Sequence, residues 1–274
     1  MLVGAQLRRL REARNISSEE AGEAIRASPS KISRLELGRT GFKRRDVADL
    51  MTLYGVTEDA EREALLALVE QANAPGWWHA YADVVPAWSD AYLGLEQAAS
   101  LIRCYDAQFV PELLQTEDYA RALIRAGHAE ASEAEIERRV ELRMGRRHLL
   151  RRPEPVSLWV VVDEAALRRR VGGTEVMRAQ LRHLIEAAEL GHVTVQVLPF
   201  AAGAGAGATG SAVILRFPEG ELSDIVYLEQ PTGALYLDKP ADVERHWHIM
   251  NRLGMEAERP DATVAVLRRV LAET

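Results

Sequence analysis

The 274-residue sequence predicts two kinds of structure in turn: an α-helical N-terminal part and a mixed α/β C-terminal part with a small central sheet. In the first seventy or so residues, apolar side chains recur at the spacing of three and four that marks amphipathic helices. From residue 157 onward, short apolar runs of strand length alternate with longer helical patterns. We therefore expect two domains, residues 1–75 and residues 76–274.

The composition limits the class of protein. Hydrophobic residues make up 47% of the chain and charged residues 27%, which is typical of a globular protein. The single cysteine, Cys104, permits no internal disulfide and fits a reducing compartment. The longest apolar runs are far too short to cross a bilayer, and no signal peptide is recognisable. The sequence thus predicts a cytoplasmic location and no contact with membranes.

Two short helices joined by a tight turn are predicted between residues 16 and 38. Ser17 and Glu20 have the S-x-x-E spacing of a capping box, so the first helix should begin near Ser18. Its inner face is expected to carry Ala21, Ala24 and Ile25. An ordinary helical hairpin inside a larger bundle is the alternative interpretation of this stretch.

The second of these helices has clear signals at both ends. Ser28 is a suitable N-cap, Pro29 suits the first helical position, and Gly38 suits the residue that ends a helix. The helical period predicts that the following residues share the inner face: Ile32 and Leu35. It predicts that these point outward: Ser30, Ser33, Arg34 and Leu37. A short helix with small polar residues and a long arginine on its exposed face suits the major groove of DNA.

The charge distribution supports an anionic partner for this region. Residues 26–45 hold seven Lys or Arg and one acidic residue, whereas the whole chain has a net charge of -7. Residues 1–55 hold 11 basic and 7 acidic side chains, a net charge of +4, and the remainder holds 23 and 34, a net charge of -11. A basic patch on an acidic protein indicates a local anionic partner.

The segment SPSKISRLELG, from Ser28 to Gly38, resembles the recognition helix of the lambda-repressor/Cro-type (XRE) helix-turn-helix family, which often reads S-x-x-x-I-S-R-x-E-x-G. The resemblance implies a sequence-specific regulator that binds double-stranded DNA, and we expect a homodimer on a roughly palindromic operator. It implies base contacts from Pro29, Ser30 and Arg34, and phosphate contacts from Ser18, Arg39 and Lys43. It also implies a structural ion pair between Arg11 and Glu36.

Three further helices are expected around this motif, at residues 2–14, at residues 44–54, and from a Thr57 cap to about Asn73. An aromatic cluster follows: Trp77, Trp78, Tyr81, Trp88 and Tyr92. A ligand box is one interpretation of it, and a packed core at the domain junction is the commoner one.

A second resemblance covers about residues 76–255. Trp77-Trp78, the VPELLQTEDYARA run and the strand-rich half look like the uncharacterised C-terminal domain attached to many XRE regulators of actinomycetes. Such regulators are linked to a small partner protein and to control of development or secondary metabolism. We therefore expect this domain to dimerise the protein and to receive a signal, from a small partner protein rather than a metabolite.

The order of elements in the C-terminal part follows from apolar patterns and turn residues. Helices are expected at residues 93–105, 116–126, 132–150, 163–171, 174–190, 241–253 and 262–272. Strands are expected at residues 105–109, 157–162, 193–198, 212–217, 225–229 and 235–237. The helix at 132–150 is rich in arginine and is interpreted as a solvated face, with a second DNA contact at residues 146–152 as the alternative.

Signs of enzymatic chemistry are weak. Gly205, Gly207 and Gly210 match G-x-G-x-x-G, but a strand rather than a helix is expected after them, so a strand-to-strand loop is the favoured interpretation over a nucleotide site. His246 and His248 do not share a helix face, so no metal site is expected. Cofactors are not predicted either.

Asp163 and Glu164 could form a catalytic carboxylate pair, although Asp163 suits a helix N-cap equally well. A hydrolase-like or ligand-binding enzyme with an appended DNA-binding domain is thus the alternative to a regulator that is not an enzyme. Hydrolysis that depends on Glu164 would favour the enzyme.

Overall fold

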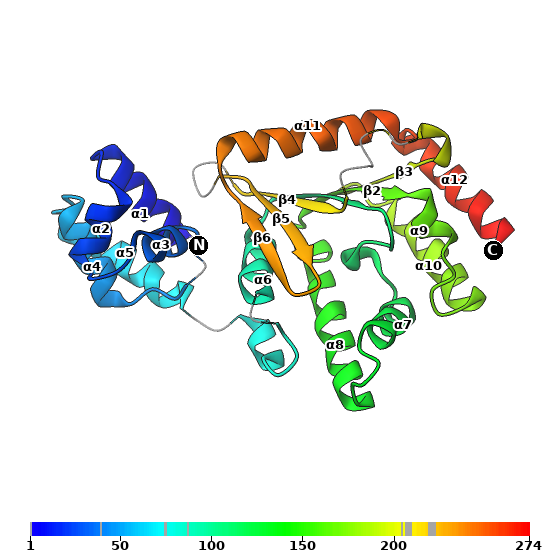
Figure 1. Cartoon of the computed structure of the whole chain (residues 1–274), viewed down its shortest axis with the longest axis horizontal. Coiled ribbons are helices and arrows are strands. Elements are labelled where there is room, and N and C mark those ends of the chain that lie inside the picture. Colours follow the sequence, from blue (N-terminus) through cyan, green and yellow to red (C-terminus); the bar gives the residue numbers. More distant parts are fainter. Residues whose placement is uncertain are drawn as a thin grey trace. The chain divides into compact units, whose positions relative to one another are not determined.

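The structure is a computed structural model of the whole chain, shown in Figure 1. It describes residues 2–38, 40–73, 76–86, 88–203, 205, 210–218 and 223–274. The chain forms two compact units. The first comprises Met1–His79, Ser89–Ala98 and Phe217–Ser223, and the second comprises Ala80–Trp88, Ala99–Arg216 and Asp224–Thr274. The expected domain boundary after residue 75 lies outside the described residues and stays a prediction.

Five helices make up most of the first unit, as the sequence predicts: α1 (Leu2–Ala13), α2 (Ser18–Ala24), α3 (Pro29–Glu36), α4 (Arg44–Leu53) and α5 (Asp59–Ala72). They enclose one core whose fully buried members come from every helix, including Leu7, Ala21, Ile32, Leu35, Leu50, Met51 and Val69. The 3-10 helix η1 (Trp77–Tyr81) and helix α6 (Ser89–Ala98) follow.

Two predicted orientations in this unit are wrong. Leu37 is buried, with 5% of its surface exposed, because α3 ends at Glu36 and the chain turns at Leu37 itself. Ala24 is exposed, and the buried positions of α2 are Ala21 and Gly22. Ala21 and Ile25 do pack on the core as predicted, so the inner face of α2 is rotated about the helix axis from Ala24 toward Gly22.

The second unit is built on a six-stranded sheet in the order β3-β2-β1-β4-β5-β6. Its strands are β1 (Leu101–Asp106), β2 (Ser157–Asp163), β3 (Val193–Leu198), β4 (Ala212–Arg216), β5 (Ile225–Gln230) and β6 (Gly233–Leu237). β1, β2 and β3 run parallel, and β4, β5 and β6 continue the sheet in antiparallel pairs. The mixed α/β class is confirmed.

Helices cover both faces of this sheet, as Figure 1 shows. Helix α11 (Pro240–Glu256) runs along one face, and its Met250 and Leu253 are buried against the strands. The other face is covered by α7 (Glu117–Gly127), α8 (Glu133–Arg146), α9 (Glu164–Arg168) and α10 (Thr174–Ala187). Helix α12 (Pro260–Glu273) packs beside β3 and α10. No helix among the described residues is long and apolar enough to cross a membrane.

The first strand is misplaced in the sequence prediction. The helix expected over residues 93–105 ends at Ala98, and the strand expected over residues 105–109 is Leu101–Asp106. This segment pairs with β2 on one side and with β4 on the other, so that Cys104 lies opposite both Val160 and Val213. Partners distant in the sequence override its local helical pattern.

The arginines of α8 do not form a solvated face. Arg143 and Arg146 both pair with Glu112, and Arg138 pairs with Asp83. Arg139 donates to the backbone oxygen of Val84. Beyond α8, Arg152 donates to the backbone oxygens of Glu154 and Ala99. These arginines are engaged within the unit, which weighs against the second DNA contact considered for residues 146–152.

The aromatic cluster at the junction is only in part a core. No side chain of η1 is buried, and Trp78 donates from its indole nitrogen to a carboxylate oxygen of Asp90 at 2.7 Å. Tyr92 is buried, with 8% of its surface exposed. Of the glycine-rich segment, Gly207 lies outside the described residues, and the element after Gly210 is the strand β4, which is not the context of a nucleotide-binding fingerprint.

Candidate nucleic-acid interface

The turn between α2 and α3 depends on a glycine. The backbone N–H of Ala27 donates to the carbonyl oxygen of Gly22 at 2.8 Å, which folds the chain back onto α2. A Cβ at Gly22 would lie 2.6 Å from the carbonyl oxygen of Ala27, so the close approach needs a residue without a side chain. Arg26, within the turn, adopts a positive φ of 54°.

The ends of both helices are formed as the sequence predicts. The Ser17 hydroxyl accepts from the Glu20 N–H while the Glu20 carboxylate accepts from the Ser17 N–H, which is a complete capping box. The Ser28 hydroxyl accepts from the Lys31 N–H at 3.2 Å, and Pro29 occupies the first turn of α3. Gly38 ends the helix with a φ of 65°.

One face of α3 is buried and the opposite face is open. Ile32 and Leu35 have no exposed surface. The exposed residues of the helix are Pro29, Ser30, Ser33 and Arg34. The open face therefore presents two small hydroxyl side chains and one guanidinium, and Leu37 does not contribute to it.

Cations in this unit divide into paired and unpaired groups. Lys31 binds Asp46 at 2.8 Å, and Arg44 binds Glu70 at 3.0 Å. Arg34 and Lys43, in contrast, are exposed and make no ion pair or hydrogen bond with the described part of the chain. Lys43 stands at the N-cap of α4, and its side chain makes no capping bond. These two cations are available to an external partner.

The two remaining residues predicted to contact phosphate are Ser18 and Arg39. Ser18 is the first residue of α2 and is half-buried. Arg39, predicted to contact phosphate, lies outside the described residues. The contacts of these residues with DNA stay predictions.

The ion pair expected between Arg11 and Glu36 is present and joins α1 to α3. Nε of Arg11 lies 2.6 Å from Oε1 of Glu36, Nη2 lies 2.9 Å from Oε2, and Nη1 donates to the carbonyl oxygen of Ile16 at 2.8 Å. The two side chains are 13% and 5% exposed. The hydrogen bond to Glu36 raises the pKa of Arg11. Burial, with the Glu36 charge nearby, raises the pKa of Tyr54 well above its usual value.

Two residues that support this surface were missed in the sequence. A Cβ at Gly4 of α1 would lie 2.4 Å from the carbonyl oxygen of Glu36, so a glycine is needed where α1 meets the end of α3. Asn73 binds both backbone groups of Phe42, at 2.9 Å and 2.6 Å, and so holds the loop that leads to Lys43. An isolated glycine in a helical pattern is a signal for such close packing. Nothing in the sequence around Asn73 indicates its two hydrogen bonds to Phe42, which lies 31 residues earlier.

A capped second helix with an open polar face, held by a buried ion pair against the helix before the motif, defines a protein with an N-terminal helix-turn-helix domain. Residues 2–65 match the family described as "Helix-turn-helix domain". Residues 89–269 match "Domain of unknown function (DUF5753)", and since this match covers more than half of the sequence, the chain belongs to the DUF5753 family. No curated protein and no solved structure matches it. The narrower resemblance to XRE regulators of actinomycetes stays a prediction.

Proposed function

We propose that this protein is a sequence-specific DNA-binding regulator of transcription. The observation that carries the proposal is the open face of α3, where Arg34 is exposed and unpaired among the described residues while the neighbouring cations Lys31 and Arg44 are bound to carboxylates. In helix-turn-helix proteins the second helix of the motif enters the major groove with its N-terminal residues at the base edges. The exposed Pro29 and Ser30 occupy that part of α3.

The proposed contacts fall into two chemical classes. Arg34 binds a base, best guanine, because its planar fork matches the two acceptors of guanine, and such a pair contributes about 1–3 kcal/mol of discrimination. Lys43, Ser18 and Arg39 bind phosphates, which add affinity but little sequence information. The net charge of -11 beyond residue 55 repels DNA from most of the remaining surface and directs it to the N-terminal helices.

The two classes respond differently to substitution. Arg34→Ala should remove the preference at one base position of a selected DNA fragment, measured by fluorescence anisotropy against single-base variants. Lys43→Ala should weaken binding to all sequences alike and reduce the slope of log affinity against log salt by about one. Lys239→Ala, at an exposed lysine of the second unit, is the control and should change neither quantity. An Arg34→Ala protein with unchanged affinity and preference would contradict the proposed role of α3.

The proposal includes a homodimer and a signal received by the C-terminal domain. Helix-turn-helix proteins commonly read two half-sites about one helical turn apart, which requires two copies of the motif. The resemblance to XRE regulators favours a small partner protein as the signal. Light scattering on the full chain, alone and with the protein encoded next to it, tests both parts. A chain that binds DNA as a monomer and does not bind the neighbouring protein would contradict both the homodimer and the partner protein.

We assign no catalytic step to the C-terminal domain, because its candidate carboxylates have structural partners. Asp163 caps α9 by accepting from the Ala165 N–H at 2.8 Å. Glu164 accepts from Nε of Arg168 at 2.7 Å and from the Phe200 N–H at 3.0 Å, and these bonds hold its pKa low against the effect of burial. Ester or amide hydrolysis that is lost in Glu164→Gln would overturn this assignment.

A further inference from the structure

An arginine of the central sheet is buried beneath α11. Arg103 of β1 is 3% exposed, and its guanidinium lies 3.7 Å from the ring centre of Trp159 and 5.0 Å from that of Trp247. Its two hydrogen bonds go to neutral acceptors: Nη1 donates to Oδ1 of Asn251 at 2.7 Å and Nη2 to the Met250 carbonyl at 3.1 Å. An arginine has five N–H groups, so three are left without a bond to the described residues.

No carboxylate compensates this charge within the described part of the chain. Burial, together with the charge of a second cation, Arg216, lowers the pKa of Arg103 to about 10. Arg216 itself is paired with Asp224 at 3.0 Å, so its own charge is balanced. A buried charge is ordinarily paired, and an unpaired one is costly. Arg103 therefore stands as a cation that lacks its anion.

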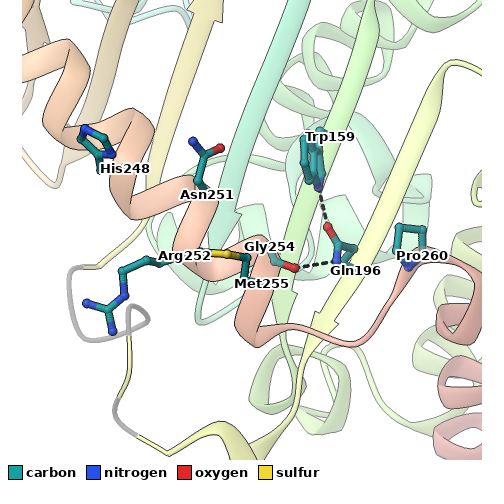
Figure 2. A pocket seen from close by; sticks show the side chains of 8 residues that line it. All are labelled: Trp159, Gln196, His248, Asn251, Arg252, Gly254, Met255 and Pro260. Atoms are coloured by element: carbon teal, nitrogen blue, oxygen red, sulfur yellow. Dashed lines mark hydrogen bonds between the residues drawn. The ribbon is translucent and has the colours of Figure 1, made fainter.

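A pocket of about 800 Å³ lies beside this arginine, at the C-terminal end of α11. Figure 2 shows its walls: Trp159 from β2, Gln196 from β3, Asn251, Gly254 and Met255 from α11, and Pro260 at the start of α12. Gln196 accepts from the Trp159 indole nitrogen at 2.7 Å and donates to the Gly254 carbonyl at 3.0 Å, which fixes the indole and the helix end. The volume falls in the usual range for small-molecule sites.

The pocket offers an apolar wall with a polar end. Met255 is 77% exposed, which is unusual for a large apolar side chain, and Trp159 and Pro260 extend the apolar surface. Since arginine has only donors, Oδ1 of Asn251 must face Arg103, and the amide nitrogen of Asn251 is left as a donor with no bond among the described residues. The other basic side chains of the wall have carboxylate neighbours: Arg252 binds Glu256 at 2.9 Å, and Nε2 of His248 lies 3.7 Å from Oε1 of Glu244.

Gly254, which has no side chain, lies between the pocket and Arg103. A Cβ at Gly254 would lie 3.2 Å from Cζ2 of Trp159, 3.6 Å from Oε1 of Gln196 and 3.8 Å from Nη2 of Arg103. A methyl group at this position would press against the indole and come within contact distance of the guanidinium. Because the residue is glycine, the backbone of α11 lies close to both groups, and both Gly254 and Trp159 line the pocket.

We propose that this pocket binds a small organic carboxylate. Its hydrocarbon body lies against Trp159 and Met255, and its carboxylate lies over Gly254. There it accepts from Arg103 and from the amide nitrogen of Asn251, and it supplies the anion that the buried guanidinium lacks. The single uncompensated charge selects a monoanion, and the apolar wall selects against small hydrophilic anions. This site does not depend on the proposed DNA binding.

Direct binding to the full chain tests the proposal. The probes are benzoate, indole-3-acetate and octanoate, each compared with its primary amide by isothermal titration calorimetry at pH 7.5. At least one acid should bind with a dissociation constant below 1 mM and at least tenfold more tightly than its amide. If no acid does so, the proposal is overturned.

Two variants locate the binding. Gly254→Ala fills the space over Trp159 with one methyl group, and alanine is the better helix former, so the chain should fold and bind the acid at least tenfold more weakly. Gly127→Ala, where a Cβ would meet nothing within 4 Å, is its matched control and should bind within twofold of the original chain. Asn251→Asp should also weaken binding at least tenfold while raising the melting temperature, because it gives Arg103 an internal carboxylate.

Each result of these binding measurements either supports or overturns the proposed site. Weaker binding in both variants with Gly127→Ala unchanged supports the site. If Gly254→Ala fails to fold, Asn251→Asp alone decides. Acid binding that is equally tight in Asn251→Asp and the original chain would overturn the proposed role of Arg103, whatever the affinity.

Discussion

Glu36→Ala would leave the Arg11 guanidinium without its carboxylate at the contact between α1 and α3. Removing one member of a fully buried pair costs about 3–5 kcal/mol. Arg11 keeps 13% exposure and its bond to the Ile16 carbonyl, which partly offset the loss. We therefore expect the first unit to lose about 2–4 kcal/mol of its free energy of unfolding.

Hydrogen exchange on the full chain measures this loss in the unit concerned. A change of about 1.4 kcal/mol is a factor of ten in an opening equilibrium, so amides of α1 and α3 that exchange by global opening should do so roughly 30 to 1,000 times faster. Amides of the central sheet should be unaffected. Glu36→Gln, which keeps the shape and removes the charge, should give an intermediate rate.

The control is Glu70→Ala, which breaks the exposed pair with Arg44. Those side chains are 70% and 59% exposed, and exposed pairs contribute about 0–1 kcal/mol. Equal exchange rates in Glu36→Ala and Glu70→Ala would refute the account of the buried pair as the link between α1 and α3.

Two further predictions concern single positions. Gly22→Ala would place a Cβ 2.6 Å from the carbonyl oxygen of Ala27, so the turn between α2 and α3 must open. The first unit should lose about 1–3 kcal/mol of its free energy of unfolding, measured as a lower melting temperature, whereas Gly127→Ala should have no such effect. Burial raises the pKa of Asp106 from its ordinary value of 3.8 to about 7. Between pH 3.8 and pH 7 the folded chain therefore binds a proton that the unfolded chain has lost, and the free energy of unfolding falls as the pH rises through that range. Asp106→Asn should remove about 2–4 kcal/mol of this fall, measured by urea unfolding of the second unit at pH 5 and pH 8, and an unchanged difference would contradict it.

The helix-turn-helix motif was predictable because its determinants are local. The caps at Ser17 and Ser28 and the stop at Gly38 act within one turn of helix, so residue type and spacing specify them. The Arg11–Glu36 pair was predictable only through the resemblance, since 25 positions separate its members. Leu37 was misplaced because a residue just beyond a helix end no longer follows the helical period.

Elements whose partners are distant in the sequence could not be placed. β1 was expected further along the chain because its strand character comes from β2 and β4, more than fifty and one hundred residues later. The same applies to the pocket beside Arg103. That arginine is the only basic residue of β1, and nothing near it in the sequence indicates that Trp159, Asn251 and Gly254 surround it.

Selection of bound fragments from genomic DNA by the full chain is the direct test of recognition by α3. We expect enrichment of a short motif, arranged as two related half-sites about one helical turn apart, and loss of preference at one position of each half-site in Arg34→Ala. Fragments with no common motif, or the same motif at the same strength from Arg34→Ala, would contradict recognition by the exposed face of α3.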